Sequence, residues 1–150
     1  MPELTRPTIR VQASFLAAMD ELRADGQGGP GDESTAGREI REYGSLWHQP
    51  EGFASYIQDL RNQETEEHAR QAGRVPETTL WWVSSDDYLG RIAIRHRLTE
   101  SLREWGGHIG YDVRPSAQRR GHGTTMLAAA LPEARALAID PALLTCDESN

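Results

Sequence analysis

The stretch from His108 to Leu131 constrains the fold more than any other part of the sequence. Apolar side chains alternate with others from Ile109 to Val113, which predicts a β-strand. Pro115 ends this strand, because proline has no N–H to donate to a ladder. A basic turn punctuated by glycine follows, and a helix-forming run begins near Gly121. Such a turn gathers main-chain N–H groups at the positive end of a helix, so the stretch predicts a pyrophosphate site.

Two common phosphate-binding motifs do not fit this turn. A Walker loop ends in Gly-Lys-Ser/Thr, but here Thr124 follows Gly123 directly, with no lysine between them. A dinucleotide fingerprint requires a third glycine where this chain has Met126. The pattern that remains is Gln118-x-x-Gly121-x-Gly123, placed directly after a strand.

This pattern resembles the coenzyme A motif of the GCN5-related N-acetyltransferases (GNAT family), which reads Arg/Gln-x-x-Gly-x-Gly/Ala. Val113 and Pro115 add the Val-x-Pro that precedes it. The alternative is an ordinary strand–turn–helix unit with surface arginines. The resemblance implies an α/β (α+β) fold, the GNAT acyl-CoA N-acyltransferase fold, with a mixed central sheet and helices on both faces. Residues 1–150 would form a single acetyltransferase-like domain, with the core coenzyme A motif at 105–146.

The resemblance also implies acetyl-CoA as the cosubstrate and no metal. The main chain of Tyr111 and Val113 would contact the pantetheine arm, and N–H groups from Arg119 to Thr124 would hold the pyrophosphate. The expected cofactor-binding residues are Tyr111, Val113, Gln118, Arg119, Arg120, Gly121, His122, Gly123 and Thr124.

The reaction implied is transfer of the acetyl group to a primary amine, from a small molecule or a peptide, by direct attack on the thioester. A free amine has a pKa of about 10.4, so a base or a water path must remove its proton. His108 is the first candidate base, because its ordinary pKa of about 6.5 suits the task. A packed or hydrogen-bonded role for His108 is the alternative, and Glu104 is the weaker candidate base. A catalytically weak or inactive coenzyme A-binding domain is the alternative function.

Composition excludes several other classes. The formal charge of −7 argues against general nucleic-acid binding and fits a cationic or neutral small substrate. No apolar run approaches the roughly 20 residues of a membrane span, so no membrane association is expected. Cys146 is the single cysteine, which excludes an intrachain disulfide and favours a cytoplasmic location. The five histidines show no paired metal-ligand spacing.

The sequence ends at Asn150, whereas members of the family it resembles normally continue into another helix and two further strands. The expectation is therefore a C-terminally truncated version of the fold. A sheet left with an open edge invites pairing with another copy, so a homodimer or larger oligomer is expected.

Hydrophobic periodicity predicts the remaining elements. The predicted strands are Leu4–Gln12, Thr79–Val83, Tyr88–Arg95 and Ala142–Cys146, and the predicted helices are Ser14–Leu22, Arg38–Tyr43, Phe53–Ala69 and Gly121–Ala138. Ser14 is the predicted cap of the first helix, and Thr99 of a short turn that reaches Arg103. Asp86 and Asp87 are the predicted hairpin turn, and Pro132 is expected to kink or split the last helix. Trp81 and Trp82 should face opposite sides of the sheet.

Overall fold

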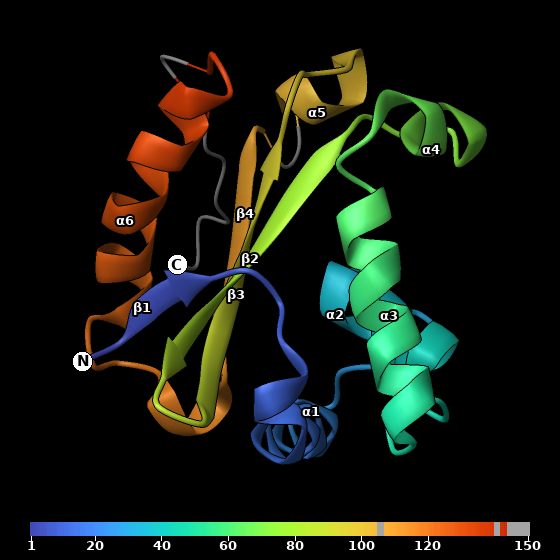
Figure 1. Cartoon of the computed structure of the whole chain (residues 1–150), viewed down its shortest axis with the longest axis vertical. Coiled ribbons are helices and arrows are strands. Elements are labelled where there is room, and N and C mark those ends of the chain that lie inside the picture. Colours follow the sequence, from blue (N-terminus) through green and yellow to red (C-terminus); the bar gives the residue numbers. More distant parts are fainter. Residues whose placement is uncertain (105–106, 140–141, 144–150) are drawn as a thin grey trace.

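A four-stranded antiparallel sheet in the order β1–β2–β3–β4 forms the centre of the protein (Figure 1). The structure is a computed structural model that describes residues 1–104, 107–139 and 142–143. The strands are β1 (Glu3–Thr5), β2 (Glu77–Ser84), β3 (Asp87–Arg95) and β4 (Ile109–Val113). The helices are α1 (Gln12–Ala24), α2 (Thr35–Tyr43), α3 (Pro50–Asn62), α4 (Glu66–Gln71), α5 (Glu100–Glu104) and α6 (His122–Ala136), with 3-10 turns η1 (Ile9–Val11) and η2 (Pro115–Ala117).

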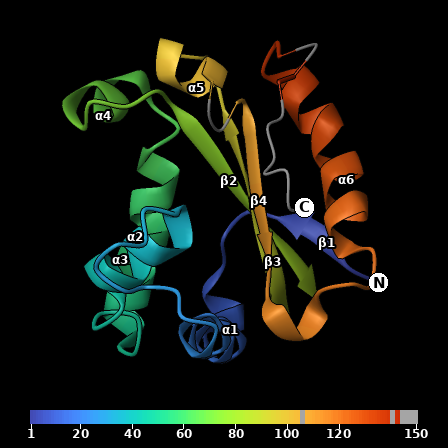
Figure 2. The ribbon, with the colours of Figure 1, turned by 180° about the vertical axis from the view of Figure 1, so that it is seen from behind.

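Each face of the sheet carries its own hydrophobic core. Helices α1, α2 and α3 cover one face and α6 covers the other, as the two opposite views show (Figures 1 and 2). Trp81 is buried in the first core and Trp82 in the second, which confirms that these neighbours face opposite sides. Phe15 of α1 is fully buried and contacts five aromatic rings. Its ring partners are Trp47, Phe53, Tyr56, Trp81 and Tyr88.

The helices on both faces match the expected α/β architecture, but the described strands are all antiparallel. The resemblance implies a mixed sheet, and a further strand is predicted at Ala142–Cys146. Only Ala142 and Leu143 of that segment lie among the described residues. Leu143 already lies beside the start of β4, where its carbonyl accepts a hydrogen bond from the N–H of His108 at 2.8 Å.

The first predicted strand is too long. Pairing with β2 stops at Thr5, because Pro7 has no N–H to offer and the chain turns away from the sheet. The hydroxyl of Thr8 then accepts a hydrogen bond from the N–H of Arg10 and starts η1 instead. As a result, Val11 enters the helical core while Ile9 is 63% exposed.

Two further predicted element boundaries are wrong. The segment from Phe53 to Ala69 forms two helices, because the hydroxyl of Thr65 caps a new helix at the N–H of His68. The hairpin turn consists of Ser85 and Asp86 rather than Asp86 and Asp87, since Asp87 already pairs with Ser84. Ser85 adopts a φ of 55° to close this two-residue turn.

One further prediction about the helices is wrong, and another is wrong in part. Ser14 does not cap α1, which begins two residues earlier; its hydroxyl accepts a hydrogen bond from the N–H of Tyr88 at 2.9 Å. Pro132 lies inside α6 without splitting it, because the helix continues to Ala136. By contrast, Thr99 does cap the turn of α5, accepting a hydrogen bond from the N–H of Leu102 at 3.1 Å.

Replacing Phe15 with alanine should lower the free energy of unfolding by about 3 to 5 kcal/mol, since a large buried ring is lost from the centre of an aromatic cluster. Urea denaturation followed by tryptophan fluorescence measures this change. Leu46→Ala is the matched control, because Leu46 is 50% exposed and its truncation should cost less than about 1 kcal/mol. Equal losses in the two variants would contradict the assignment of the core.

Candidate functional site

The turn between β4 and α6 presents consecutive main-chain N–H groups. Arg119 and Gly121 both adopt left-handed backbone conformations, with φ of 64° and 81°, and Gly121 is the N-cap of α6. Left-handed residues among right-handed ones form a nest, in which successive N–H groups converge on one point. The N–H groups of residues 119 to 124 have no acceptor among the described residues, and the first helical bond runs from Thr125 to Gly121.

Neighbouring side chains hold this turn in place. The amide of Gln118 donates to the carbonyl of Val113 at 3.0 Å and so fastens the turn to the end of β4. His122 accepts a hydrogen bond at Nδ1 from the indole N–H of Trp82 at 3.0 Å, which ties the first turn of α6 to β2. A Cβ on Gly123 would lie 3.1 Å from the ring of Tyr111, so glycine allows the helix to approach β4 closely.

Glu21 of α1 supports the same turn from the other side. Its carboxylate forms an ion pair with Arg114 and accepts hydrogen bonds from the N–H of Ser116 at 2.8 Å and its hydroxyl at 3.0 Å. Burial raises the pKa of Glu21, but the bonds from Arg114 and Ser116 outweigh it, so its pKa lies below the ordinary value. Arg114 also donates to the carbonyl of Tyr88 at 3.1 Å, so its guanidinium is held by contacts within the fold.

The register of β4 directs alternate main-chain groups to its outer edge. Hydrogen bonds from Arg95 N to His108 O and from Arg114 N to Leu89 O bracket the β3–β4 ladder. In an antiparallel pair with these bonds, the main-chain N–H and C=O groups of the even-numbered residues of β4 point toward β3. Those of the odd-numbered residues point away from it. Tyr111 and Val113 therefore offer main-chain groups to the outer edge, although Gln118 already occupies the Val113 carbonyl.

A cavity of about 180 Å³ lies on the opposite face of β4, beneath the start of α2. Its lining residues are Ser34, Thr35, Arg91, Ala93, Arg95, Gly110, Tyr111 and Asp112. Asp112 is the acidic residue of this set and lies opposite Arg91 in the ladder. Asp112 is exposed at the surface, but the protein around its carboxyl group desolvates it and raises its pKa; Arg91 opposes this shift and Glu39 reinforces it.

A buried ion pair forms part of the same wall. Arg91 of β3 pairs with Glu39 of α2, with only 6% and 12% of the two side chains exposed. The hydroxyl of Tyr56 donates to Glu39 at 2.7 Å, and Arg91 lies 3.4 Å from the same hydroxyl. Burial is the main reason that the pKa of Tyr56 lies well above its ordinary value, so it remains a neutral donor.

Sequence reasoning missed Asp112 as a candidate base, although the signal was present. Strand alternation places its side chain on the face opposite Tyr111. That face was not recognised as the wall of a cavity, because α2 reaches it only through the tertiary fold.

The two bases predicted from sequence occupy other surroundings. His108 accepts a hydrogen bond at Nδ1 from the N–H of Leu143 at 2.9 Å, so the lone pair that a base requires is already engaged. Burial, with a contribution from Arg103, lowers the pKa of His108. Glu104 is exposed at the end of α5 and does not line the cavity that contains Asp112. The geometry therefore favours Asp112 over both.

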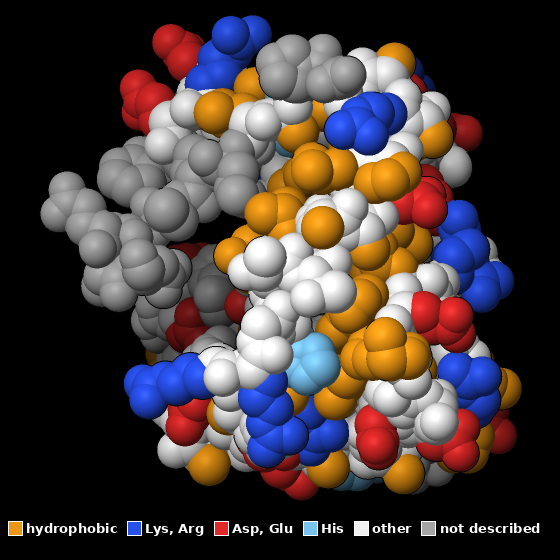
Figure 3. All heavy atoms as spheres, turned by 90° about the vertical axis from the view of Figure 1, so that its left-hand side faces the viewer, with side chains coloured by type: hydrophobic (Ala, Val, Ile, Leu, Met, Phe, Trp, Pro, Cys, Tyr) orange, Lys and Arg blue, Asp and Glu red, His pale blue; other side chains and the backbone are white. Residues whose placement is uncertain are grey.

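The face covered by α6 has a distinct surface (Figure 3). A band of hydrophobic side chains runs along it, and arginine side chains gather at its lower end, where α6 begins. Arg119 and Arg120 are both exposed beside the free N–H groups of the turn. Among residues 1–104, 107–139 and 142–143, no three His, Cys, Asp or Glu side chains come together as metal ligands. None of the helices in this part of the chain is long and apolar enough to cross a bilayer.

The chain belongs to the acetyltransferase (GNAT) family, which it matches over residues 40–150. Among solved structures it is similar to the PaiA N-acetyltransferase of Thermoplasma acidophilum in complex with coenzyme A, with a TM-score of 0.48 and 14% identity over 93% of this chain and 75% of that one. Comparison with curated proteins found no match. The family inferred from the motif is thereby confirmed.

The contacts of Glu21 predict a pH-dependent contribution to stability. Glu21→Gln should lower the free energy of unfolding at pH 7 by about 1 to 3 kcal/mol, because charged hydrogen bonds to Arg114 and Ser116 are weakened. A lowered carboxyl pKa stabilises the fold above its unfolded value of about 4.3, and this contribution disappears as the pH falls through the folded value.

Denaturant titrations of both proteins between pH 3 and pH 7 test this prediction. The difference between wild type and variant should shrink below about pH 4. Asp20→Asn is the matched control, since Asp20 lies on the same helix with 70% of its side chain exposed. A pH-independent difference would contradict the role given to Glu21.

Proposed function

We propose that this protein is an N-acetyltransferase that moves the acetyl group of acetyl-CoA to a primary amine. The observation that carries the proposal is the row of N–H groups from residue 119 to residue 124 with no acceptor among the described residues. Unpaired donors at the start of a long helix favour a multiply charged anion such as a pyrophosphate. Family membership makes coenzyme A the anion expected there.

The residues of the turn fit the cofactor well. Arg119 and Arg120 are exposed and have no carboxylate partner among the described residues, so both can add positive charge beside the phosphates. Gly121 leaves open space where a side chain would stand, and Gly123 holds α6 close to Tyr111. The outer edge of β4 at Tyr111 and Val113 offers main-chain partners to an extended arm, in the manner of an added strand.

On the other face of β4, the cavity beneath α2 is the site proposed for the amine. Acetyl-CoA supplies the acetyl group as an activated thioester, and the protein must remove a proton from the amine. Asp112 is the proton acceptor that we assign, directly or through one water, because its carboxyl group faces this cavity. Asp112 is exposed and so open to an incoming amine, and its raised pKa makes it a stronger base than a carboxylate with an ordinary pKa.

Gly121→Asp should weaken coenzyme A binding by a factor on the order of 100 or more, since a carboxylate among the free donors repels the phosphates. Calorimetric titration with coenzyme A measures the affinity. Gly26→Asp is the matched control: Gly26 also has a positive φ, 89°, and open space around its Cβ position, but it lies after α1. If both variants bind coenzyme A as wild type does, the turn is not the pyrophosphate site.

Asp112→Asn should lower kcat by a factor on the order of 100 and leave coenzyme A affinity unchanged, because only proton removal is affected. In the wild type, kcat should rise with pH through the raised pKa of Asp112, as the carboxylate forms. The variant should lack this limb. Free thiol release with a panel of amines measures both, and Asp87→Asn, an exposed acid on β3, is the control.

A change in kcat of less than about threefold in Asp112→Asn would refute the base assignment while leaving the transferase intact. Binding of coenzyme A without turnover of any amine would instead indicate a binding domain.

A further inference from the structure

The cavity beside Asp112 adjoins two others, one of them lined in part by α2 and the segment after α4. It shares Arg95 with a second cavity of about 350 Å³, and that cavity shares Arg38 and Arg74 with a third of about 180 Å³. We call these the inner, middle and outer cavities. Because their walls share residues, the three cavities adjoin one another, with Arg95 between the inner and the middle one.

The middle cavity has an excess of positive charge. Its charged residues are Arg38, Arg74, Glu77 and Arg95. Glu77 is committed to Arg95, with 3.5 Å between carboxylate and guanidinium and 18% of each side chain exposed. Arg38 and Arg74 have no carboxylate within ion-pairing distance in the described part of the chain. Two cations therefore face this space without a counterion from the described residues.

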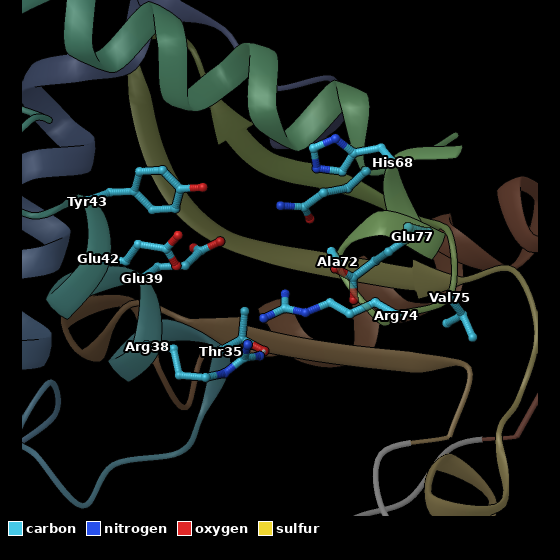
Figure 4. Close-up of a pocket in the computed structure, with 12 residues that line it drawn as sticks. Thr35, Arg38, Glu39, Glu42, Tyr43, His68, Ala72, Arg74, Val75 and Glu77 are labelled. Carbon is cyan, nitrogen blue, oxygen red and sulfur yellow. The ribbon is translucent and has the colours of Figure 1, made fainter. Parts of the chain in front are cut away.

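The two arginines converge from separate elements (Figure 4). Arg38 extends from α2 and Arg74 from the segment after α4, and their guanidinium ends point toward one another. Like charges repel, so such an arrangement is unfavourable until an anion lies between them. Each guanidinium presents a planar fork of donors that matches a carboxylate, and each keeps its charge at every pH at which the protein is folded.

The acidic residues of the outer cavity do not cancel this charge. Glu39 already pairs with Arg91 and accepts the Tyr56 hydroxyl. Glu42 is exposed and lines the outer cavity but not the middle one. In Figure 4 Glu39 and Glu42 lie with Tyr43, apart from the guanidinium ends of Arg38 and Arg74.

We propose that the acceptor is an amine that also carries a carboxylate, with the carboxylate held between Arg38 and Arg74 and the amine directed to the inner cavity. This inference rests on the proposed acetyl transfer and names its substrate class. Transfer forms the amide bond as the thioester bond breaks; the amine proton leaves to Asp112 or water, and the thiol of coenzyme A is released. The carboxylate takes no part in this chemistry and serves only to position the amine.

The test uses ω-amino acids from glycine to 6-aminohexanoate, each paired with its ω-amino amide, which has the same amine but no negative charge. The best amino acid should exceed its amide by about tenfold or more in kcat/KM, as expected for one charged contact. Arg38→Gln and Arg74→Gln should each raise KM for the amino acid by about tenfold and change kcat little. Neither variant should alter KM for the amide. Arg70→Gln, an exposed arginine on α4 that lines none of the three cavities, is the matched control.

A second measurement separates this inference from the proposed reaction. Calorimetry of the same amino acids and amides with the coenzyme A-bound protein reports binding without turnover. One outcome is that the wild type binds amino acids more tightly than amides, the Arg38→Gln and Arg74→Gln variants lose this preference, and neither ligand is acetylated. That result would support the anion site and refute the transferase. Acetylation of amides as fast as amino acids, with both arginine variants unchanged, would support the transferase and overturn the anion site. Absence of carboxylate preference in both measurements would overturn it equally.

Discussion

Because β4 pairs with β3 along one edge, the alignment of these two strands determines where both parts of the site lie. Main-chain groups of Tyr111 and Val113 turn to the outer edge, while the side chain of Asp112 turns to the cavity under α2. Slipping the register by one residue would exchange these sets. The hydrogen bonds at His108 and Arg114 hold the two ends of the ladder and prevent that exchange. The site therefore depends on a backbone alignment before it depends on any single side chain.

The Arg91–Glu39 pair explains how a charged cavity exists between buried layers. Removing two charges from water is costly, and their attraction repays it only when further hydrogen bonds satisfy them, as Tyr56 does here. The pair links α2 to β3 and so fixes the roof of the cavity. The positive charge of Arg91 also limits the rise in the pKa of Asp112, which keeps that carboxyl group able to ionise.

Sequence patterns with local causes predicted the structure well. The turn before α6 follows from Pro115 and its glycines, and the two tryptophans alternate as any adjacent strand residues do. The errors had two sources: a local signal that was passed over, and a distant partner that decided the outcome. Pro7 ended the first strand, and the hydroxyl of Ser14 served Tyr88 of β3 instead of its own helix.

One part of the candidate site could be predicted from the sequence and the other could not. A contiguous motif revealed the pyrophosphate turn, whereas the cavity requires α2, β3 and β4 to meet, and no short pattern encodes that meeting. Local alternation gave the direction of the Asp112 side chain but not what it would face. His108 shows the converse case: its ordinary pKa suits a base, but in the fold its Nδ1 accepts the N–H of Leu143, as the hydrogen-bonded alternative expects.

The total charge is a poor guide to what this protein binds. A formal charge of −7 favours cationic or neutral substrates on average, yet both proposed ligands carry anionic groups. At physiological ionic strength the Debye length is about 8 Å, so charges on remote surfaces contribute little at either site. Inside the turn, the free N–H groups and the exposed Arg119 and Arg120 set the local field. In the middle cavity, Arg38 and Arg74 set it. An acidic exterior and two local sites for anions are therefore compatible, because recognition is decided within a few ångströms of the ligand.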